Sequence, residues 1–148
     1  MKQAERVRKI LLRIPRQGRF WIREVSSVKT VTIHTEKRRH FISMNPRFVG
    51  KLSDRQLKSV LIHELQHLKH NHSEKCRWLV TLLTSKEIVR LFRIAADLEV
   101  NQEVKCIRGQ VKVGKGEFKN YQKGLNAEQY FVCILHARIC RSTQTRKT

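Results

Sequence analysis

Hydrophobic positions alternate with polar ones in the first third of the chain, and a period of two predicts β-strands. The alternation runs over residues 19–25, 28–34 and 40–44, with the charged stretch 36–39 as a hairpin loop. Before these strands, one helix is predicted from apolar positions at helical spacing: Val7, Ile10, Leu11 and Ile14. The start of the chain therefore predicts a helix followed by a small three-stranded sheet.

The spacing of apolar residues changes to that of a helix after Asn45 and Pro46, which close the third strand. Ser53 is a favourable N-cap, and Gln56, three residues further on, completes a capping box. The helix that they open has an apolar side formed by Leu57, Val60, Leu61, Leu65 and Leu68. It is predicted to end near Asn71.

Further helices are predicted towards the C-terminus. A second long helix is predicted to begin near residue 78. A third is predicted from residue 86 to about residue 104, and the last covers roughly residues 127 to 140. Residues 105–124 contain four glycines and no helical period, which indicates a long loop. The chain is therefore predicted to be an α+β protein with a single domain over residues 1–140 and a disordered basic tail over residues 141–148.

A formal net charge of +20, from 32 Lys and Arg against 12 Asp and Glu, dominates the composition. Charge of this sign attracts nucleic acid and anionic lipid. The basic residues are spread along the chain, however, and no helix-turn-helix or zinc-finger spacing organises them. We therefore expect nonspecific nucleic-acid binding at most. No apolar run approaches the roughly 18 residues that span a membrane, so no membrane partner is expected.

The four cysteines form no C-x-x-C pair: Cys76, Cys106, Cys133 and Cys140. Cys133 and Cys140 are predicted to share one helix, where a bridge between them would be strained. Charged residues interrupt the first thirteen positions, which excludes a secretory signal there. Free thiols in a cytoplasmic protein are the expectation. The composition does not indicate an oligomeric state.

The sequence His63-Glu64-Leu65-Gln66-His67 lies on the helix opened by Ser53. Histidines four residues apart on a helix face the same side, so both can bind one zinc ion. At about 100° per residue, Glu64 falls within the apolar side of the helix. A carboxylate there is costly unless something binds it, and a zinc-bound water would do so. The rival interpretation is a chance pattern with hydrogen-bonded core histidines.

A catalytic zinc usually takes three protein ligands, and Asp97 is the first candidate for the third. On its helix Asp97 shares a face with Ile94 and Asn101, and small alanines beside it allow another helix to approach. Glu99 and Glu103 are predicted to face solvent. The rival interpretation pairs Asp97 with a core arginine such as Arg93.

His72, just past the end of the first long helix, is the reserve candidate for the third ligand. Asn71 before it is able to turn the chain back. His70 is weaker because its position on the helix points to solvent. Asn101, one turn after Asp97, is placed to hydrogen-bond a metal ligand.

Three blocks in order resemble the putative metallopeptidase domain found upstream of VWA-like domains in bacteria and phages. The first is FISMNPRFVGKLSDRQLKSVLIHELQHLKHNH, where a strand and an Asn-Pro turn precede H-E-x-x-H and another histidine follows at His72. The second, IAADLEVNQ, is similar to an alanine-rich helix with an Asp and a nearby Asn. The third, GLNAEQYF, is similar to an Ala-Glu-x-x-Tyr helix start. The likeness covers roughly residues 40 to 135.

This resemblance implies a zincin-like fold with a zinc cofactor. It implies that His63 and His67 are zinc ligands, that Glu64 is the catalytic acid and base, and that Asp97 is the third ligand. The stretch HLKHNHS also resembles SprT-like metalloproteases, whose third ligand is a histidine in this region. The spacing is one residue short of that pattern, which ranks this resemblance second.

Two departures from the first family limit what is carried over. The sequence has no VWA-like portion, so regulation or partners that it would provide are not inferred. An arginine usually follows the last histidine of the family motif, and Lys75 or Arg77 must take its place here.

The function predicted from these features is zinc-dependent hydrolysis of peptide bonds, with a peptide or protein as the substrate. The strand over residues 40–44 precedes the metal-binding helix, and in zincin-like folds such a strand aligns an extended substrate by β-addition. The alternative function is a basic, nucleic-acid-associated module in which the metal site is structural or inactive.

Overall fold

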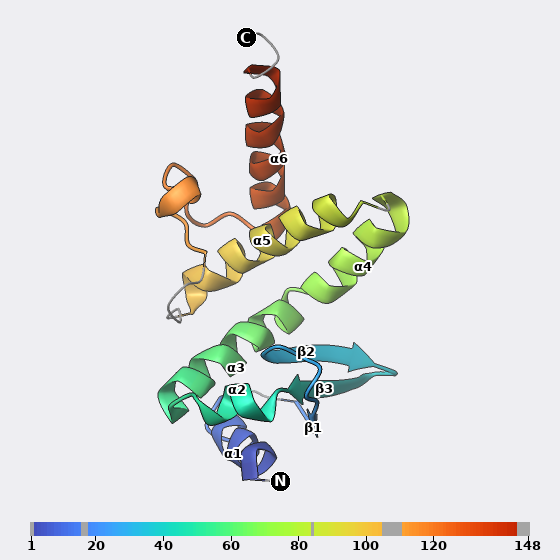
Figure 1. Cartoon of the computed structure of the whole chain (residues 1–148), viewed down its shortest axis with the longest axis vertical. Coiled ribbons are helices and arrows are strands. Elements are labelled where there is room, and N and C mark those ends of the chain that lie inside the picture. Colours follow the sequence, from blue (N-terminus) through green and yellow to red (C-terminus); the bar gives the residue numbers. More distant parts are fainter. Residues whose placement is uncertain (1, 16–17, 84, 105–110, 145–148) are drawn as a thin grey trace. The chain divides into compact units, whose positions relative to one another are not determined.

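The computed structural model describes residues 2–15, 18–83, 85–104 and 111–144. The chain forms two compact units, residues 1–70 and residues 71–148 (Figure 1). A three-stranded sheet lies in the first unit, and the second unit is helical. The predicted α+β class, with a small N-terminal sheet followed by helices, is confirmed.

The first unit contains three helices and one sheet. In chain order its elements are α1 (Lys2–Leu11), β1 (Phe20–Glu24), β2 (Val31–Glu36), β3 (Arg39–Met44), α2 (Pro46–Gly50) and α3 (Asp54–Lys69). The strand order is β1-β3-β2, with β1 parallel and β2 antiparallel to β3. The three predicted strands and the predicted helices therefore all form, with ends shifted by a few residues.

Lys37 and Arg38 make the tight turn between β2 and β3. Both have left-handed backbone angles, with φ of 47° and 63°. Two successive residues of this kind match the right-handed twist of the flanking strands, which is why such turns join hairpins. The turn fixes the register that pairs Glu36 with Arg39 and Val31 with Met44.

The central position of β3 corrects one prediction. The strand over residues 40–44 was expected to align an extended substrate by β-addition. Its two edges are already hydrogen-bonded, one to β1 and the other to β2. A strand with both edges paired has no free backbone groups for another chain, so β3 does not take this role.

The core of the first unit lies on one face of this sheet. Four strand residues on that face are buried: Val31, Ile33, Ile42 and Met44. Helix α3 packs against β2 and α1, and α1 also packs against β1. Buried helix residues complete the core: Val7, Ile10, Val49, Leu57 and Leu61. Burial of these side chains is the main force that holds α3 in place.

Arg6 of α1 fixes the start of α3. Its Nε donates to Asp54 Oδ1 at 2.8 Å, and its two terminal nitrogens donate to the carbonyls of Val49 at 3.0 Å and Leu52 at 2.6 Å. Val49 lies at the end of α2, and Leu52 lies between α2 and α3. One guanidinium therefore satisfies three acceptors where the chain enters the helix.

The second unit contains α4 (His72–Leu83), α5 (Lys86–Glu103), the 3-10 turn η1 (Gly116–Phe118) and α6 (Ala127–Gln144). Helix α4 begins six residues before the predicted start near Trp78, because Asn71, with φ of 55°, ends one helix and the next begins at once. Helix α6 extends beyond the predicted end at Cys140 into the predicted tail. Residues 105–110 and 145–148 lie outside the described residues.

Helix α5 is buried on two sides. On one side Leu91, Ala95 and Leu98 pack with Phe118 and with α6, through Tyr130 and Ile134. On the other side, residues of α5 form a cluster with α4 and α6: Phe92 and Ala96 with Leu79 and Ala127. The alanines that were predicted to allow close helix packing do so.

None of the described helices is long and apolar enough to cross a membrane. Within the described residues, Cys76, Cys133 and Cys140 are free thiols. Cys133 and Cys140 share α6, as predicted. Cys106 lies outside the described residues.

Candidate metal centre

Helix α3 carries the predicted histidine pair in a regular, well-capped segment. The Ser53 Oγ accepts from the Gln56 backbone N–H at 3.2 Å, and the Gln56 Oε1 accepts from the Ser53 N–H at 2.8 Å. The predicted capping box is therefore confirmed. At the other end the His70 N–H donates to the Gln66 carbonyl at 3.0 Å. A helix that is intact from end to end keeps residues four apart one turn apart.

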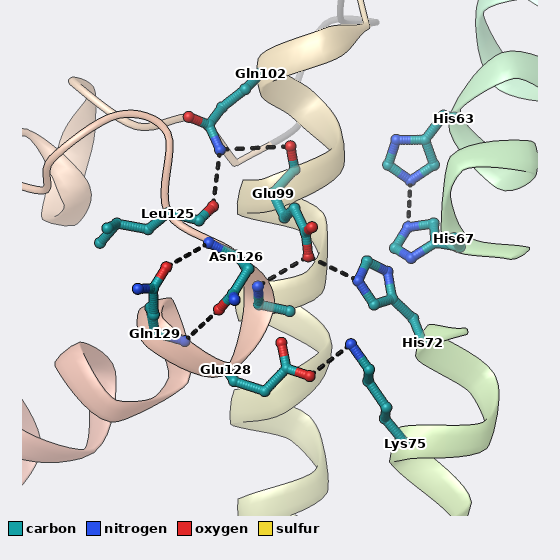
Figure 2. Close-up of polar contacts among 11 residues, drawn as sticks. His63, His67, His72, Lys75, Glu99, Gln102, Leu125, Asn126, Glu128 and Gln129 are labelled. Carbon is teal, nitrogen blue, oxygen red and sulfur yellow. Dashed lines mark hydrogen bonds and ion pairs between the residues drawn. The ribbon is translucent and has the colours of Figure 1, made fainter. Parts of the chain in front are cut away.

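His63 and His67 point their Nε2 atoms at each other. The two nitrogens are 3.0 Å apart, and the rings meet edge to face with centroids 4.6 Å apart (Figure 2). His63 is 8% exposed, and His67 is half-buried. Without an ion, one Nε2 must carry a proton for the other to accept.

This pair fits a metal ion. Two imidazole nitrogens bound to one tetrahedral zinc, at ordinary Zn–N lengths, lie about 3.3 Å apart. The separation of 3.0 Å between the Nε2 atoms of His63 and His67 is within a few tenths of an ångström of that value. Neutral imidazole is a common zinc ligand, so both the geometry and the chemistry of the two donors suit zinc.

Glu64 follows His63 on α3 and is half-buried. The prediction placed this acid inside the apolar side of the helix, which holds the buried Leu57, Val60 and Leu61. Partial burial of Glu64 agrees with that placement. Glu64 directly follows the first histidine of the pair, and its role as general base stays a prediction.

Asp97 lies on α5, in the second unit, and is half-buried. Its neighbours Ala96 and Leu98 are buried. Burial raises the pKa of the Cys76 thiol on α4, the Arg93 guanidinium opposes this through its charge and a hydrogen bond, and the charge of Asp97 adds to the rise. Asp97 is therefore within electrostatic reach of α4. Its role as a metal ligand stays a prediction.

Glu99 is the residue that the sequence placed wrongly. It was predicted to face solvent, but its side chain is only 11% exposed. Its Oε2 accepts from His72 Nε2 at 2.9 Å and from the Ala127 backbone N–H at 2.8 Å (Figure 2). The carboxylate thus joins the start of α4 and the start of α6 to α5. The sequence does contain a signal for this burial, because Glu99 lies at helical spacing from Phe92 and Ala96 and so on the same stripe of α5.

His72, the reserve candidate for the third ligand, is buried with 3% of its side chain exposed. Its Nε2 is the ring nitrogen that pairs with Glu99. A histidine held in this way has one nitrogen committed to a structural contact. Asn101 is also buried, and its Nδ2 donates to the Val111 carbonyl at 2.8 Å, which joins Val111 to α5. Its predicted contact with a metal ligand stays untested.

Comparison with known families bears on this site. The sequence model of the family described as a putative metallopeptidase domain matches residues 19–138. The chain belongs to this family. The match covers most of both compact units and confirms the resemblance found in the sequence. Membership of a metallopeptidase family supports a metal-dependent peptidase, and thus a hydrolase that takes a peptide or protein substrate and a metal cofactor. None of the curated proteins or solved structures compared with the chain matches it.

Proposed function

We propose that the chain is a zinc-dependent peptidase in which His63 and His67 hold the metal and Glu64 is the general base. The observation that carries this proposal is the meeting of the two Nε2 atoms at 3.0 Å on α3, in a chain of a metallopeptidase family. When bound, zinc polarises a peptide carbonyl and lowers the pKa of a coordinated water towards about 7.

Glu64 supplies the proton transfer in this proposal. Its carboxylate accepts a proton from the attacking water and then gives it to the amine that leaves. The half-buried position on α3 supports this role, because exclusion of bulk water strengthens the interactions of a carboxylate with a reaction partner. His63 and His67 stay neutral in this scheme, since only a deprotonated ring nitrogen binds metal.

Asp97 is proposed as the third zinc ligand. Two observations within the second unit support it over His72. The His72 Nε2 is paired with Glu99 inside the unit, and the Asp97 carboxylate is half-buried on α5. Carboxylate oxygen together with two imidazole nitrogens is a ligand set that catalytic zinc sites use.

Hydrolysis of a peptide mixture tests the proposal. The zinc-loaded wild type is incubated with random peptides, and new amino termini are measured. Glu64→Gln should retain zinc and lose activity by roughly 100-fold or more. Glu74→Gln, which changes an exposed acid on α4, is the matched control and should retain full activity. Equal cleavage by Glu64→Gln and the wild type would overturn the role of Glu64, and no cleavage by the zinc-loaded wild type would overturn the peptidase.

A further inference from the structure

The sheet of the first unit has a second face, opposite to the core. Because side chains alternate along a strand, the neighbours of the buried core residues project to this side. We call it the outer sheet face. Its aromatic and charged residues come from β1, β2 and β3 and from the residue just before β1: Arg19, Trp21, Arg23, His34, Glu36, Arg39 and Phe41. The outer sheet face combines aromatic and basic side chains.

Two aromatic residues of the outer sheet face differ in access. Phe41 is 7% exposed, because the Arg23 guanidinium lies 3.9 Å from its ring centroid and His34 stacks on it at 5.7 Å. Trp21, its neighbour across the β1–β3 pair, is 46% exposed. The face therefore has a covered aromatic base at Phe41 and an open indole at Trp21.

Positive charge surrounds the open indole. The guanidinium carbons of Arg19 and Arg39 lie 5.9 Å and 5.6 Å from the Trp21 ring centroid. Glu36 is the one acid among the described strand residues of this face, and it pairs with Arg23 at 3.9 Å. Arg19 and Arg39 therefore leave the surface beside Trp21 positive, in a chain whose net charge is already +20.

We propose that the outer sheet face binds single-stranded nucleic acid, with a base stacked on Trp21 and phosphates bound by Arg19 and Arg39. Aromatic rings on an open surface stack with any base, and flanking cations hold the backbone, which is the combination that single-strand binding needs. A duplex hides its base faces and is read by a helix or ribbon inserted in a groove, which a flat sheet face does not provide. An acidic peptide would use the arginines but not the indole.

The chain has two tryptophans, Trp21 and Trp78, which makes the contact directly observable. Trp78→Phe leaves Trp21 as the only tryptophan, and Trp21→Phe leaves Trp78, which is 64% exposed on α4. Both variants are titrated with an oligothymidylate of about 16 nucleotides, the upper end of common site sizes. Stacking should quench the fluorescence of the Trp78→Phe protein and leave that of the Trp21→Phe protein almost unchanged.

Affinity measurements provide the second arm. Trp21→Ala should weaken oligothymidylate binding by roughly 5- to 100-fold, and Trp78→Ala should not. Arg19→Ala combined with Arg39→Ala should lower the slope of log affinity against log salt by about 1.4, because two phosphate contacts to a single strand are lost at about 0.7 each. The matched control combines Arg55→Ala with Arg77→Ala, two exposed arginines that lie on the helices α3 and α4 and not on the sheet.

Three results would overturn the proposal. The first is wild-type affinity in Trp21→Ala or in the Arg19 and Arg39 double variant. The second is equal quenching of both single-tryptophan proteins. The third is binding of polyglutamate with the same affinity and the same quenching of Trp21, which would assign the face to an acidic peptide. Glu64→Gln should bind oligothymidylate as the wild type does, so the proposal fails or holds independently of the peptidase.

Discussion

The Glu99 carboxylate accepts two hydrogen bonds inside the second unit, and its removal should destabilise that unit. His72 Nε2 and the Ala127 N–H both bond to Oε2, at 2.9 Å and 2.8 Å. In Glu99→Ala both donors lose their acceptor while His72 remains buried. Hydrogen bonds to a charged group contribute about 1.5–3 kcal/mol each, and part of this is offset by the cost of burying the carboxylate. The expected loss is therefore about 2–4 kcal/mol of unfolding free energy.

Glu99→Gln removes the negative charge and keeps the shape of the side chain, so it separates the two contributions to stability. The amide oxygen still accepts a hydrogen bond, so the expected loss is only about 1 kcal/mol. Glu103→Ala, an exposed acid one turn further along α5, is the matched control and should change stability by less than about 0.5 kcal/mol. Urea denaturation followed by circular dichroism gives the three values. Faster amide exchange at Ala127 in Glu99→Ala provides a local readout of the same contact.

A Glu99→Ala protein no less stable than Glu103→Ala would contradict the structural role of the Glu99 carboxylate. Destabilised Glu99→Ala protein in which the Ala127 amide keeps wild-type protection would contradict it as well. In that second case the loss would come from a contact other than the one to the start of α6.

Three further predictions follow from local contacts. Ser53→Ala should lower the unfolding free energy by about 1 kcal/mol through loss of the α3 cap, and an unchanged denaturation midpoint would contradict this. Partial burial tends to raise the pKa of Glu128, but the hydrogen bond from Lys75, the backbone N–H and nearby positive charge together lower it. Its stabilising effect is therefore present above the unfolded-state pKa and lost as pH falls through the lowered value, so Glu128→Gln should flatten the acid side of the stability curve. Burial raises the pKa of Cys76, so a thiol reagent should modify it more slowly than the exposed Cys133; equal rates by mass spectrometry would count against this.

Local signals predicted much of the fold. The capping box of Ser53 and Gln56 fixes the start of α3 through contacts three residues apart, which the sequence displays directly. The bounds of α5 followed from helical spacing for the same reason. The start of α4 was missed because residues 72–77 are mostly polar, so the apolar pattern appears only later in the helix.

The sequence did not predict which strands pair with each other. The order β1-β3-β2 places β3 between two strands, and nothing in its alternation of residues distinguishes a central strand from an edge strand. Glu99 was misplaced for a related reason. A helix with one buried stripe would place Glu99 on its solvent side, but α5 packs on two sides, with Ala95 in one cluster and Ala96 in the other. An acid outside the first stripe was therefore buried in the second.

The histidine pair shows what a short motif does predict. Residues four apart on a helix have a fixed relation, so the convergence of His63 and His67 followed from the sequence alone. Both candidates for the third ligand, Asp97 and His72, lie on other helices, and which of them meets the pair depends on tertiary contacts that a local motif does not contain; the choice of Asp97 stays a proposal.

Zinc content tests the central claim most directly. The wild type, His63→Ala, His67→Ala, Asp97→Ala and His72→Gln are purified in the presence of zinc, dialysed and analysed for metal and protein. We expect one zinc ion per chain in the wild type and in His72→Gln, and loss of zinc in the other three variants. Full occupancy in Asp97→Ala with loss in His72→Gln would contradict the ligand assignment, and a wild type without zinc would contradict the metal site itself.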